Sequence, residues 1–264
     1  MLGATGPLPS AKAHPQQHGS WTVSKSGGIG ETIRTVVYAI LIALGIRTFA
    51  YEPFNIPSGS MIPTLLVGDY LFVSKFSYGY SRYSLPFGLP LIPGRILFTE
   101  PERGDVVVFK LPRDNETDYI KRIIGLPGDR IRMVDGRLYI NNELVKRERI
   151  EDFVPEEAPS MRVSQYMETL PNGRRHRILE RSDNGMLDNT PEYLVPAGHY
   201  FGMGDNRDDS VDSRVLAGVG YIPRENLVGR ADVLFFSSNG TASLWELWKW
   251  PFAIRYDRLF DGIR

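Results

Sequence analysis

The chain has 264 residues, of which 42% are hydrophobic and 23% charged, so it can bury the core of an ordinary globular protein. Its 31 basic and 31 acidic residues cancel, and no dense run of lysine and arginine offers a stripe for phosphates, so we expect no nucleic-acid partner. It has no cysteine, which excludes disulfides, thiolate zinc sites and a cysteine nucleophile.

The first segment, residues 1–30, is rich in Gly, Pro, Ser, Ala and Gln, and Trp21 is its only large aromatic residue. Such a composition cannot bury enough apolar surface to offset the entropy lost on ordering. We predict a disordered tail, which the charges described below place in the cytoplasm.

The next segment, residues 31–54, is predicted to be a single transmembrane helix. Its uncharged centre, residues 35–46, spans only about 18 Å of helix, short of the roughly 30 Å hydrocarbon layer. Arg34 and Arg47 can snorkel toward the two surfaces, which lengthens the span. The alternatives are a buried helix of a soluble protein and a cleavable signal peptide. Arg47 lies just ahead of the candidate cleavage site, which favours an uncleaved anchor over the signal peptide.

The charges before this helix predict its orientation. Lys12, Lys25 and Arg34 oppose the single acid Glu31, and positive flanks stay in the cytoplasm. Everything after residue 55 is then expected on the outer face of the membrane.

The remaining chain predicts β structure, because short runs rich in β-branched and aromatic residues alternate with turn signals such as LPGD. Residues 55–133 and 197–240 are predicted to form a β core, and the more polar residues 134–196 an inserted subdomain.

Two segments are candidates for contact with lipid. Residues 77–98 combine tyrosines, prolines and aliphatic residues, and residues 241–264 carry three closely spaced tryptophans. Tyrosine and tryptophan prefer the membrane interface. The alternative is a hydrophobic loop and a packed terminal helix.

The stretch NIPSGSMIPTLLVGDYLF, residues 55–72, holds Ser58 and Ser60 in an apolar setting that is rare for a flexible linker. A serine nucleophile needs a base, and the four histidines of the chain form no suitable cluster, so lysine is the candidate. A lysine base must be neutral, which requires burial. Lys121 in DYIKRIIGLPGD fits best, with Lys75 and Lys110 as rivals. 

The neighbour of this lysine, Arg122, points to the opposite face of a strand and needs an anion. The stretch GDNRDDSVDSR, residues 204–214, could supply one. It predicts a rigid loop held by arginine–carboxylate pairs. The alternatives are a solvated loop and a calcium loop. Two arginines oppose a cation there, so we expect no metal and no cofactor.

Taken in order behind the anchor, SGSM with GDYLFVSK, then DYIKRIIGLPGD, then GDNRDDSVDSR closely resemble bacterial type I signal peptidase over about residues 31–255. The resemblance implies a mostly β, antiparallel-sheet fold, with a catalytic β core and an inserted β subdomain behind a single transmembrane helix. It also implies a Ser/Lys endopeptidase in the bacterial cytoplasmic membrane that cuts signal peptides from exported preproteins after small residues, the Ala-x-Ala pattern. The expected partners are preprotein signal peptides and membrane lipid, close to the secretion translocon.

The family's roles fall on particular residues of this chain. The nucleophile matches Ser60, the general base Lys121, and the oxyanion donors the Ser58 hydroxyl and the Ser60 amide. Residues that match the supporting positions are Ser210, Asp205, Arg122, Asp212 and Arg214. Residues that match the substrate pockets are Phe54, Ile56, Met61, Leu65, Tyr119 and Ile120.

Two positions depart from the family pattern, where Asp209 replaces a common asparagine and Val211 a frequent alanine. Neither is a proposed chemical group. The alternative functions are a catalytically inactive, membrane-anchored β-rich binding or scaffold protein, and a self-cleaving Ser/Lys repressor. The repressor would carry a DNA-binding helical domain where this chain carries its apolar segment.

Overall fold

The computed structural model describes residues 29–85, 88–243 and 245–264. The predicted disordered tail lies outside these residues, apart from Ile29 and Gly30, which begin the first helix. Residues up to Ile40 and residues from Leu41 onward form two units, which we describe separately.

The long helix α1 covers Ile29–Phe49, and its 21 residues span about 31 Å, close to the thickness of the hydrocarbon layer. Its apolar side chains are exposed, and among the described residues it is the single helix long and apolar enough to cross a membrane. The helix fits a single-pass anchor.

The predicted anchor ran to residue 54, whereas the helix ends at Phe49 and the strand β1 covers Tyr51–Asn55. Pro53 cannot donate a backbone hydrogen bond to a continuing helix. It is tolerated in β1 because this strand lies at the edge of its sheet and, among the described strands, pairs with β2 (Asp69–Ser74) alone.

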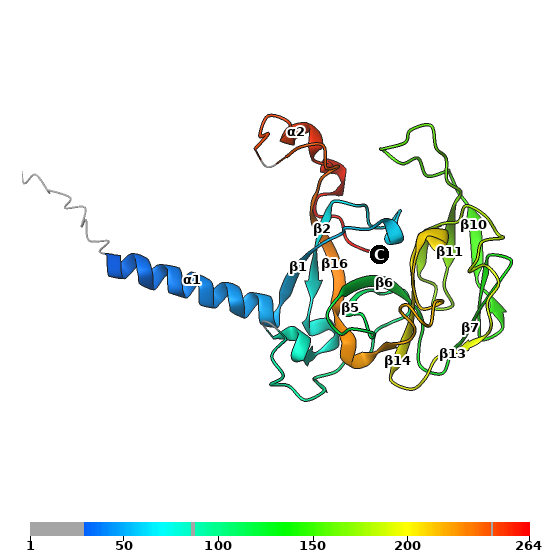
Figure 1. Ribbon diagram of the computed structural model, residues 1–264, viewed down its shortest axis with the longest axis horizontal. Coiled ribbons are helices and arrows are strands. Elements are labelled where there is room, and N and C mark those ends of the chain that lie inside the picture. The colour runs from blue at the N-terminus through cyan, green and yellow to red at the C-terminus, as the bar shows by residue number, and fades with distance from the viewer. Residues whose placement is uncertain (1–28, 86–87, 244) are drawn as a thin grey trace, which may run out of the picture. The chain divides into compact units, whose positions relative to one another are not determined.

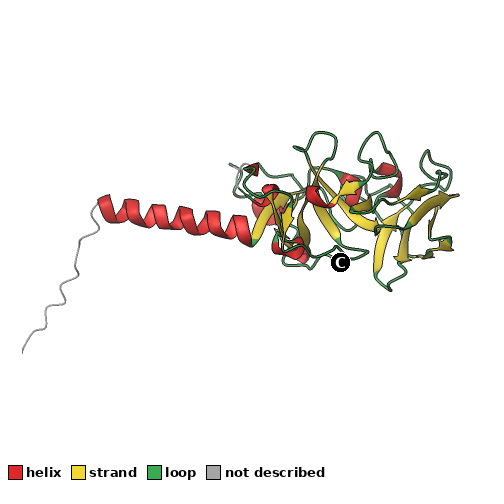
Figure 2. Cartoon of the chain, turned by 90° about the horizontal axis from the view of Figure 1, so that it is seen from below, coloured by secondary structure: helices red, strands yellow, loops and turns green. Residues whose placement is uncertain are grey.

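The predicted mostly β, antiparallel fold is confirmed (Figures 1 and 2). The largest sheet has seven strands, and every neighbouring pair is antiparallel. In spatial order they are β1, β2 (Asp69–Ser74), β16 (Leu227–Ser237), β5 (Val106–Lys110), β6 (Asp118–Gly125), β14 (His199–Met203) and β15 (Ile222–Pro223).

Three smaller sheets complete the β structure. They are the four-stranded β13 (Tyr193–Leu194), β7 (Arg130–Val134), β8 (Arg137–Ile140) and β9 (Glu143–Leu144); the three-stranded β10 (Lys146–Arg149), β11 (Gln165–Thr169) and β12 (Arg175–Leu179); and the pair β3 (Tyr80–Ser81) and β4 (Arg95–Ile96). The predicted insert, residues 134–196, thus supplies the whole three-stranded sheet. Its borders as a subdomain stay a prediction.

The helical elements beyond α1 in the described residues are short. They are η1 (Gly59–Met61), η2 (Phe76–Tyr78), η3 (Arg82–Ser84), η5 (Arg207–Asp209), η6 (Arg224–Asn226), α2 (Trp250–Ala253) and η7 (Tyr256–Arg258).

The strand β6 is paired differently along its two halves. Residues 118–122 pair with β5 on one side, and pairing with β14 on the other side begins at Arg122. Within the described part of the chain, residues 118–121 therefore have one unpaired edge. Along the same strand the side chains change from exposed at Asp118 to buried from Lys121 onward.

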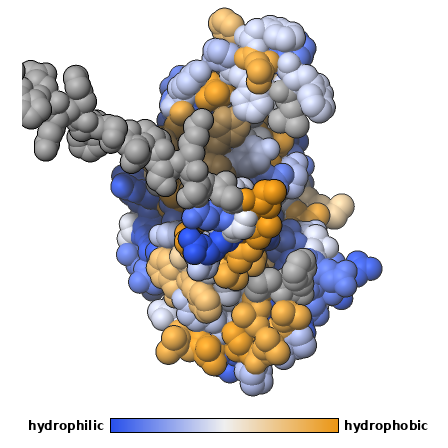
Figure 3. All heavy atoms as spheres, turned by 90° about the vertical axis from the view of Figure 1, so that its left-hand side faces the viewer, coloured by the Kyte–Doolittle hydropathy of each residue, from blue (hydrophilic) through white to orange (hydrophobic). Residues whose placement is uncertain are grey.

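The two segments that we considered for lipid contact expose large hydrophobic side chains. Trp245, Trp248 and Phe252 are exposed near the C-terminal end, and Leu91 and Leu97 in the earlier segment. Figure 3 shows hydrophobic residues gathered in patches on the face it draws. The alternative of a packed terminal helix does not fit this exposure.

Candidate active site

The fold brings together two side chains that lie 61 positions apart in the sequence, Ser60 in η1 and Lys121 in β6. The Nζ atom of Lys121 lies 2.8 Å from the Oγ atom of Ser60 and 3.0 Å from the carbonyl oxygen of Ile120. Both side chains are withdrawn from solvent, with Lys121 2% and Ser60 8% exposed. A serine hydroxyl and a lysine amine thus share a hydrogen bond away from water.

Burial lowers the pKa of Lys121 from 10.5 to about 8, because the ammonium form loses its hydration. The carboxylates of Asp212 and Asp205 oppose this shift, and Arg214 supports it. The amine is therefore neutral in a substantial fraction of molecules near neutral pH, as a general base requires.

The two rival lysines are engaged elsewhere. Lys75 is buried, pairs with Glu52 at 2.8 Å and donates to the carbonyl oxygen of Ser84 at 3.0 Å. Lys110 pairs with Asp118 at 2.9 Å. Each amine thus contacts a carboxylate, whereas Lys121 contacts the Ser60 hydroxyl.

The second serine of the motif stands beside the first. Ser58 has an extended backbone just before η1, and its Oγ atom lies 3.5 Å from that of Ser60. This places a second hydroxyl next to the candidate nucleophile.

The sequence analysis missed Asn206, which holds the turn that carries Ser60. Its backbone N–H donates to the Ser60 carbonyl oxygen at 3.1 Å, and its Nδ2 atom donates to the Gly59 carbonyl oxygen at 3.0 Å. This asparagine belongs to the GDN sequence, but nothing there distinguishes it from the many charged residues that follow.

The glycine at position 204 permits this close approach. A Cβ atom there would lie 2.2 Å from the Ser210 Oγ and 2.5 Å from the Ser60 carbonyl oxygen, closer than atoms can pack. Ser210 is buried, and its Oγ has no hydrogen-bond partner among the described residues. Its role in orienting Lys121 stays a prediction.

Arg122 forms the ion pair that we expected from its position on the strand. Its Nε and Nη2 atoms donate to the two carboxylate oxygens of Asp205 at 2.8 and 2.7 Å, and both side chains are buried. Burial alone would raise the pKa of Asp205, but the charge and hydrogen bonds of Arg122 hold it below the usual value. Thr64 adds a hydrogen bond of 2.5 Å to the same carboxylate.

The arginine–carboxylate pair predicted within residues 204–214 is formed by Arg214 and Asp212. Two hydrogen bonds of 2.9 Å join the guanidinium to the carboxylate, which also accepts from the Gly204 amide at 3.0 Å. Arg214 donates further to the carbonyl oxygen of Arg207. These hydrogen bonds join the beginning, the middle and the end of the loop to one another.

Sequence analysis also missed Glu168 and His176, which come from β11 and β12. Glu168 accepts two hydrogen bonds from Arg207, at 3.0 and 2.5 Å. His176 Nε2 lies 3.3 Å from Glu168, and burial together with the charge of Arg122 lowers the pKa of this imidazole. No local signal pairs Arg207 with a glutamate 39 residues away.

A groove runs past Ser60 and Lys121. Of the predicted pocket residues, Phe54, Ile56, Tyr119 and Ile120 line it. Met61 and Leu65 do not, because both are fully buried in the cluster of core residues behind Ile56. The groove also includes Asp209 and Val211, the two positions that depart from the family pattern.

The comparisons with known proteins agree on one family. The family described as "Signal peptidase, peptidase S26" matches residues 29–236. Signal peptidase I of Rickettsia conorii is 42% identical and covers 86% of this chain and 90% of its own, and that of Rickettsia typhi is 40% identical and covers 89% and 94%. A crystal structure of a signal peptidase I from Enterococcus faecalis is 26% identical, covers 50% of this chain and 97% of its own, and has a TM-score of 0.30.

The burial of Lys121 should cost stability. Because its pKa falls from 10.5 to about 8, replacing it with an apolar side chain of similar length, Lys121→Met, should stabilise the fold at pH 7 by up to about 3 kcal/mol. The unfolded chain binds more protons than the folded chain between pH 8 and 10.5, so wild-type stability rises over that range and the advantage of the variant shrinks. Urea unfolding at pH 7 and 10 measures both effects. A variant less stable than wild type at pH 7 would contradict the argument.

Proposed function

The chain belongs to the signal peptidase family, peptidase S26, and we propose that it removes signal peptides from exported preproteins by a Ser/Lys mechanism, with Ser60 as nucleophile and Lys121 as general base. The observation that carries the proposal is the distance of 2.8 Å between Lys121 Nζ and Ser60 Oγ at a buried site. An inactive scaffold has no need for a lysine amine held in this way.

In the first step, neutral Lys121 takes the proton of the Ser60 hydroxyl as Oγ forms a bond to the scissile carbonyl carbon. The ammonium then gives that proton to the departing amine as the peptide bond breaks, which leaves an acyl group on Ser60. Lys121, neutral again, takes a proton from the water molecule that attacks the acyl carbon, and gives it to the Oγ atom of Ser60 as the ester bond breaks and the acid product leaves. With a pKa of about 8, about a tenth of the amine is neutral at pH 7.

The negative charge on the carbonyl oxygen needs hydrogen-bond donors. We assign this role to the backbone N–H of Ser60 and the hydroxyl of Ser58, which lies 3.5 Å from the nucleophile. Asn206 supports this N–H by two hydrogen bonds to the η1 turn, one to the carbonyl oxygen of Ser60 and one to that of Gly59.

The substrate adds as an extended strand in this proposal. Residues 118–121 of β6 offer a free strand edge within the described region, and the groove beside them is bounded on its other side by Phe54–Ser60. Peptides bind such edges through backbone hydrogen bonds, while pockets for alternate side chains give specificity. The apolar side chains of Phe54, Ile56 and Ile120 suit the small residues of an Ala-x-Ala site.

In this proposal the chain meets its substrate at the membrane. We propose that α1 anchors the chain in the bacterial cytoplasmic membrane with its N-terminus inside and the catalytic region in the periplasm, near the secretion translocon. The exposed tryptophans of residues 241–264 and the exposed leucines of residues 77–98 suit contact with lipid headgroups.

The dyad can be tested by removing either chemical group. Ser60→Ala and Lys121→Arg should each lower the rate of preprotein cleavage by at least about 10⁴-fold, because one lacks the nucleophile and the other carries a guanidinium that stays protonated. The matched control is Lys110→Arg, which keeps a cation beside Asp118 and should cleave normally. Near wild-type cleavage by folded Lys121→Arg would refute the assignment.

The oxyanion role of Ser58 predicts a smaller loss. Ser58→Ala should lower kcat by about 10² to 10³, roughly 3 to 4 kcal/mol of transition-state stabilisation, with little change in KM. Ser58→Thr keeps a hydroxyl and should retain more activity. If kcat of Ser58→Ala equalled that of wild type, the second donor would have to be sought elsewhere.

The pH dependence follows from the pKa of the base. Because the neutral amine is the active form, kcat/KM should rise about tenfold per pH unit below pH 8 and level off above it. Cleavage assays from pH 6 to 9.5 measure this profile. A rate that is flat between pH 6 and 8 would contradict lysine as the base.

A further inference from the structure

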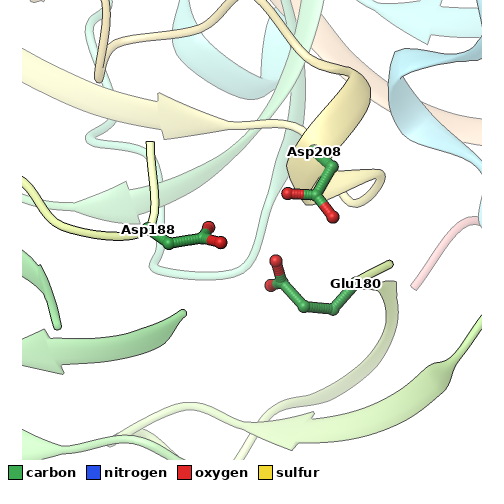
Figure 4. A group of neighbouring side chains, drawn as sticks. All are labelled: Glu180, Asp188 and Asp208. Atoms are coloured by element: carbon green, nitrogen blue, oxygen red, sulfur yellow. The ribbon is translucent and has the colours of Figure 1, made fainter. Parts of the chain in front are cut away.

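Three carboxylates outside the proposed catalytic groups point toward one another (Figure 4). Glu180 follows β12, Asp188 lies in the loop before β13, and Asp208 belongs to η5. Their oxygen atoms lie within 4.8 Å of one another. Three separate segments thus contribute negative charge to one point.

Two of these carboxylates are buried without the partners that buried acids need. Glu180 is 2% exposed and Asp188 0% exposed. Both carboxylate oxygens of Glu180 and the Oδ1 atom of Asp188 have no hydrogen-bond partner within the described residues. Buried carboxylate oxygens without a hydrogen bond are strongly unfavourable, so these oxygens lack a partner that would satisfy them.

Arg147 forms an ion pair with Glu180 but no hydrogen bond. Arg147 Nη1 lies 3.7 Å from Glu180 Oε2, too far for a hydrogen bond, and its Nη2 atom is engaged by Asp183 at 2.7 Å. Burial raises the pKa of Glu180 to about 9, and it also raises the pKa of Asp188. The charges of Arg207 and Arg147 lower the pKa of Glu180, and that of Arg214 lowers the pKa of Asp188, but neither effect offsets burial.

The remaining oxygens of the cluster are held in place by backbone amides. Asp208 Oδ2 accepts from the N–H groups of Arg181 and Ser182, and Asp188 Oδ2 accepts from that of Gly185. A Cβ atom at Gly185 would lie 2.9 Å from Asp208 Oδ1 and 3.1 Å from Asp188 Oδ2. The glycine leaves this space open, and the free oxygens face inward.

We propose that Glu180, Asp188 and Asp208 bind a Ca²⁺ ion. The donors are all oxygens, which favours a hard cation. Ca²⁺ accepts oxygen ligands in flexible geometry with bonds of about 2.3 to 2.6 Å, whereas Mg²⁺ demands near-ideal octahedral geometry, so a site with only three protein carboxylates favours Ca²⁺. Water reaches the remaining coordination positions past Asp208, which is exposed.

The ion would act through the loop that supports Ser60. Asp208 is flanked in η5 by Arg207, which binds Glu168, and by Asp209, which lines the groove. A bridge from Asp208 to the end of β12 would fix this loop without touching the Ser60–Lys121 pair.

Residues 204–214 alone predict no metal, because two arginines there oppose a cation. In the structure those arginines are neutralised by Glu168 and Asp212. The candidate site takes one ligand from that stretch and two from outside it, so the objection does not apply.

The test uses the full chain in detergent, stripped with a chelator and then titrated with CaCl₂ by isothermal calorimetry. One Ca²⁺ should bind per chain, and Ca²⁺ at 100 times its Kd should raise the thermal midpoint by about 5 to 10 °C, with a smaller response to Mg²⁺. If the wild type binds no Ca²⁺, the proposal is wrong, whatever the variants do.

Variants assign the binding to these side chains. Glu180→Gln and Asp188→Asn keep size and remove charge, and each should lose Ca²⁺ binding and the thermal shift. The matched control is Glu192→Gln, an acid between Asp188 and β13 that pairs with Arg130 outside the cluster and should keep both. If Glu180→Gln binds Ca²⁺ as the wild type does, the ion lies elsewhere. If the wild type does not respond to Ca²⁺ and Glu180→Gln is more stable than the wild type, the carboxylates share a proton. The proposal then fails.

Discussion

A lysine amine kept out of water beside a serine hydroxyl is the constraint on which the rest of this structure depends. Lys121 can be neutral near pH 7 because burial makes its ammonium form unfavourable. That burial depends on three features of the fold. The sheet covers the side chain, a nearby turn brings Ser60 Oγ to 2.8 Å from Lys121 Nζ, and the walls of the groove are largely apolar. The same burial lowers the stability of the fold, so the chain keeps a destabilising group where the proposed chemistry needs it.

The charges around this pair are arranged so that they largely cancel. Asp205 and Asp212 would each restore the ammonium form of Lys121, yet Arg122 and Arg214 hold both carboxylates in bidentate pairs. These pairs support the loop without removing the effect of burial on the amine. The support extends into the predicted insert through Glu168, so that segment contributes to the rigidity of the site although none of its residues lines the groove.

The position of Lys121 along β6 links binding to chemistry. Pairing with β14 begins at Arg122, so Lys121 is the last residue of the half whose edge is unpaired within the described chain. A peptide added at that edge would end beside the amine and the η1 turn. The residue that follows, Arg122, points to the other face and belongs to the buried ion-pair network. In the proposed function, one strand therefore supplies substrate contacts, base and support in consecutive residues.

The sequence by itself determined the apolar helix, the β character of the rest, and the two serines and one lysine at the centre of the site, because each has a local signal in hydropathy, alternation or a short motif. It misplaced the end of the helix, where pairing of β1 with β2 overrides the apolar run. Only the tertiary structure decided that Asn206 holds the Ser60 turn, that Met61 and Leu65 pack in the core, that Glu168 meets Arg207, and that Glu180, Asp188 and Asp208 converge. Each of these depends on contacts between segments far apart in the chain, and local pattern carries no information about which distant partner a buried polar group will find.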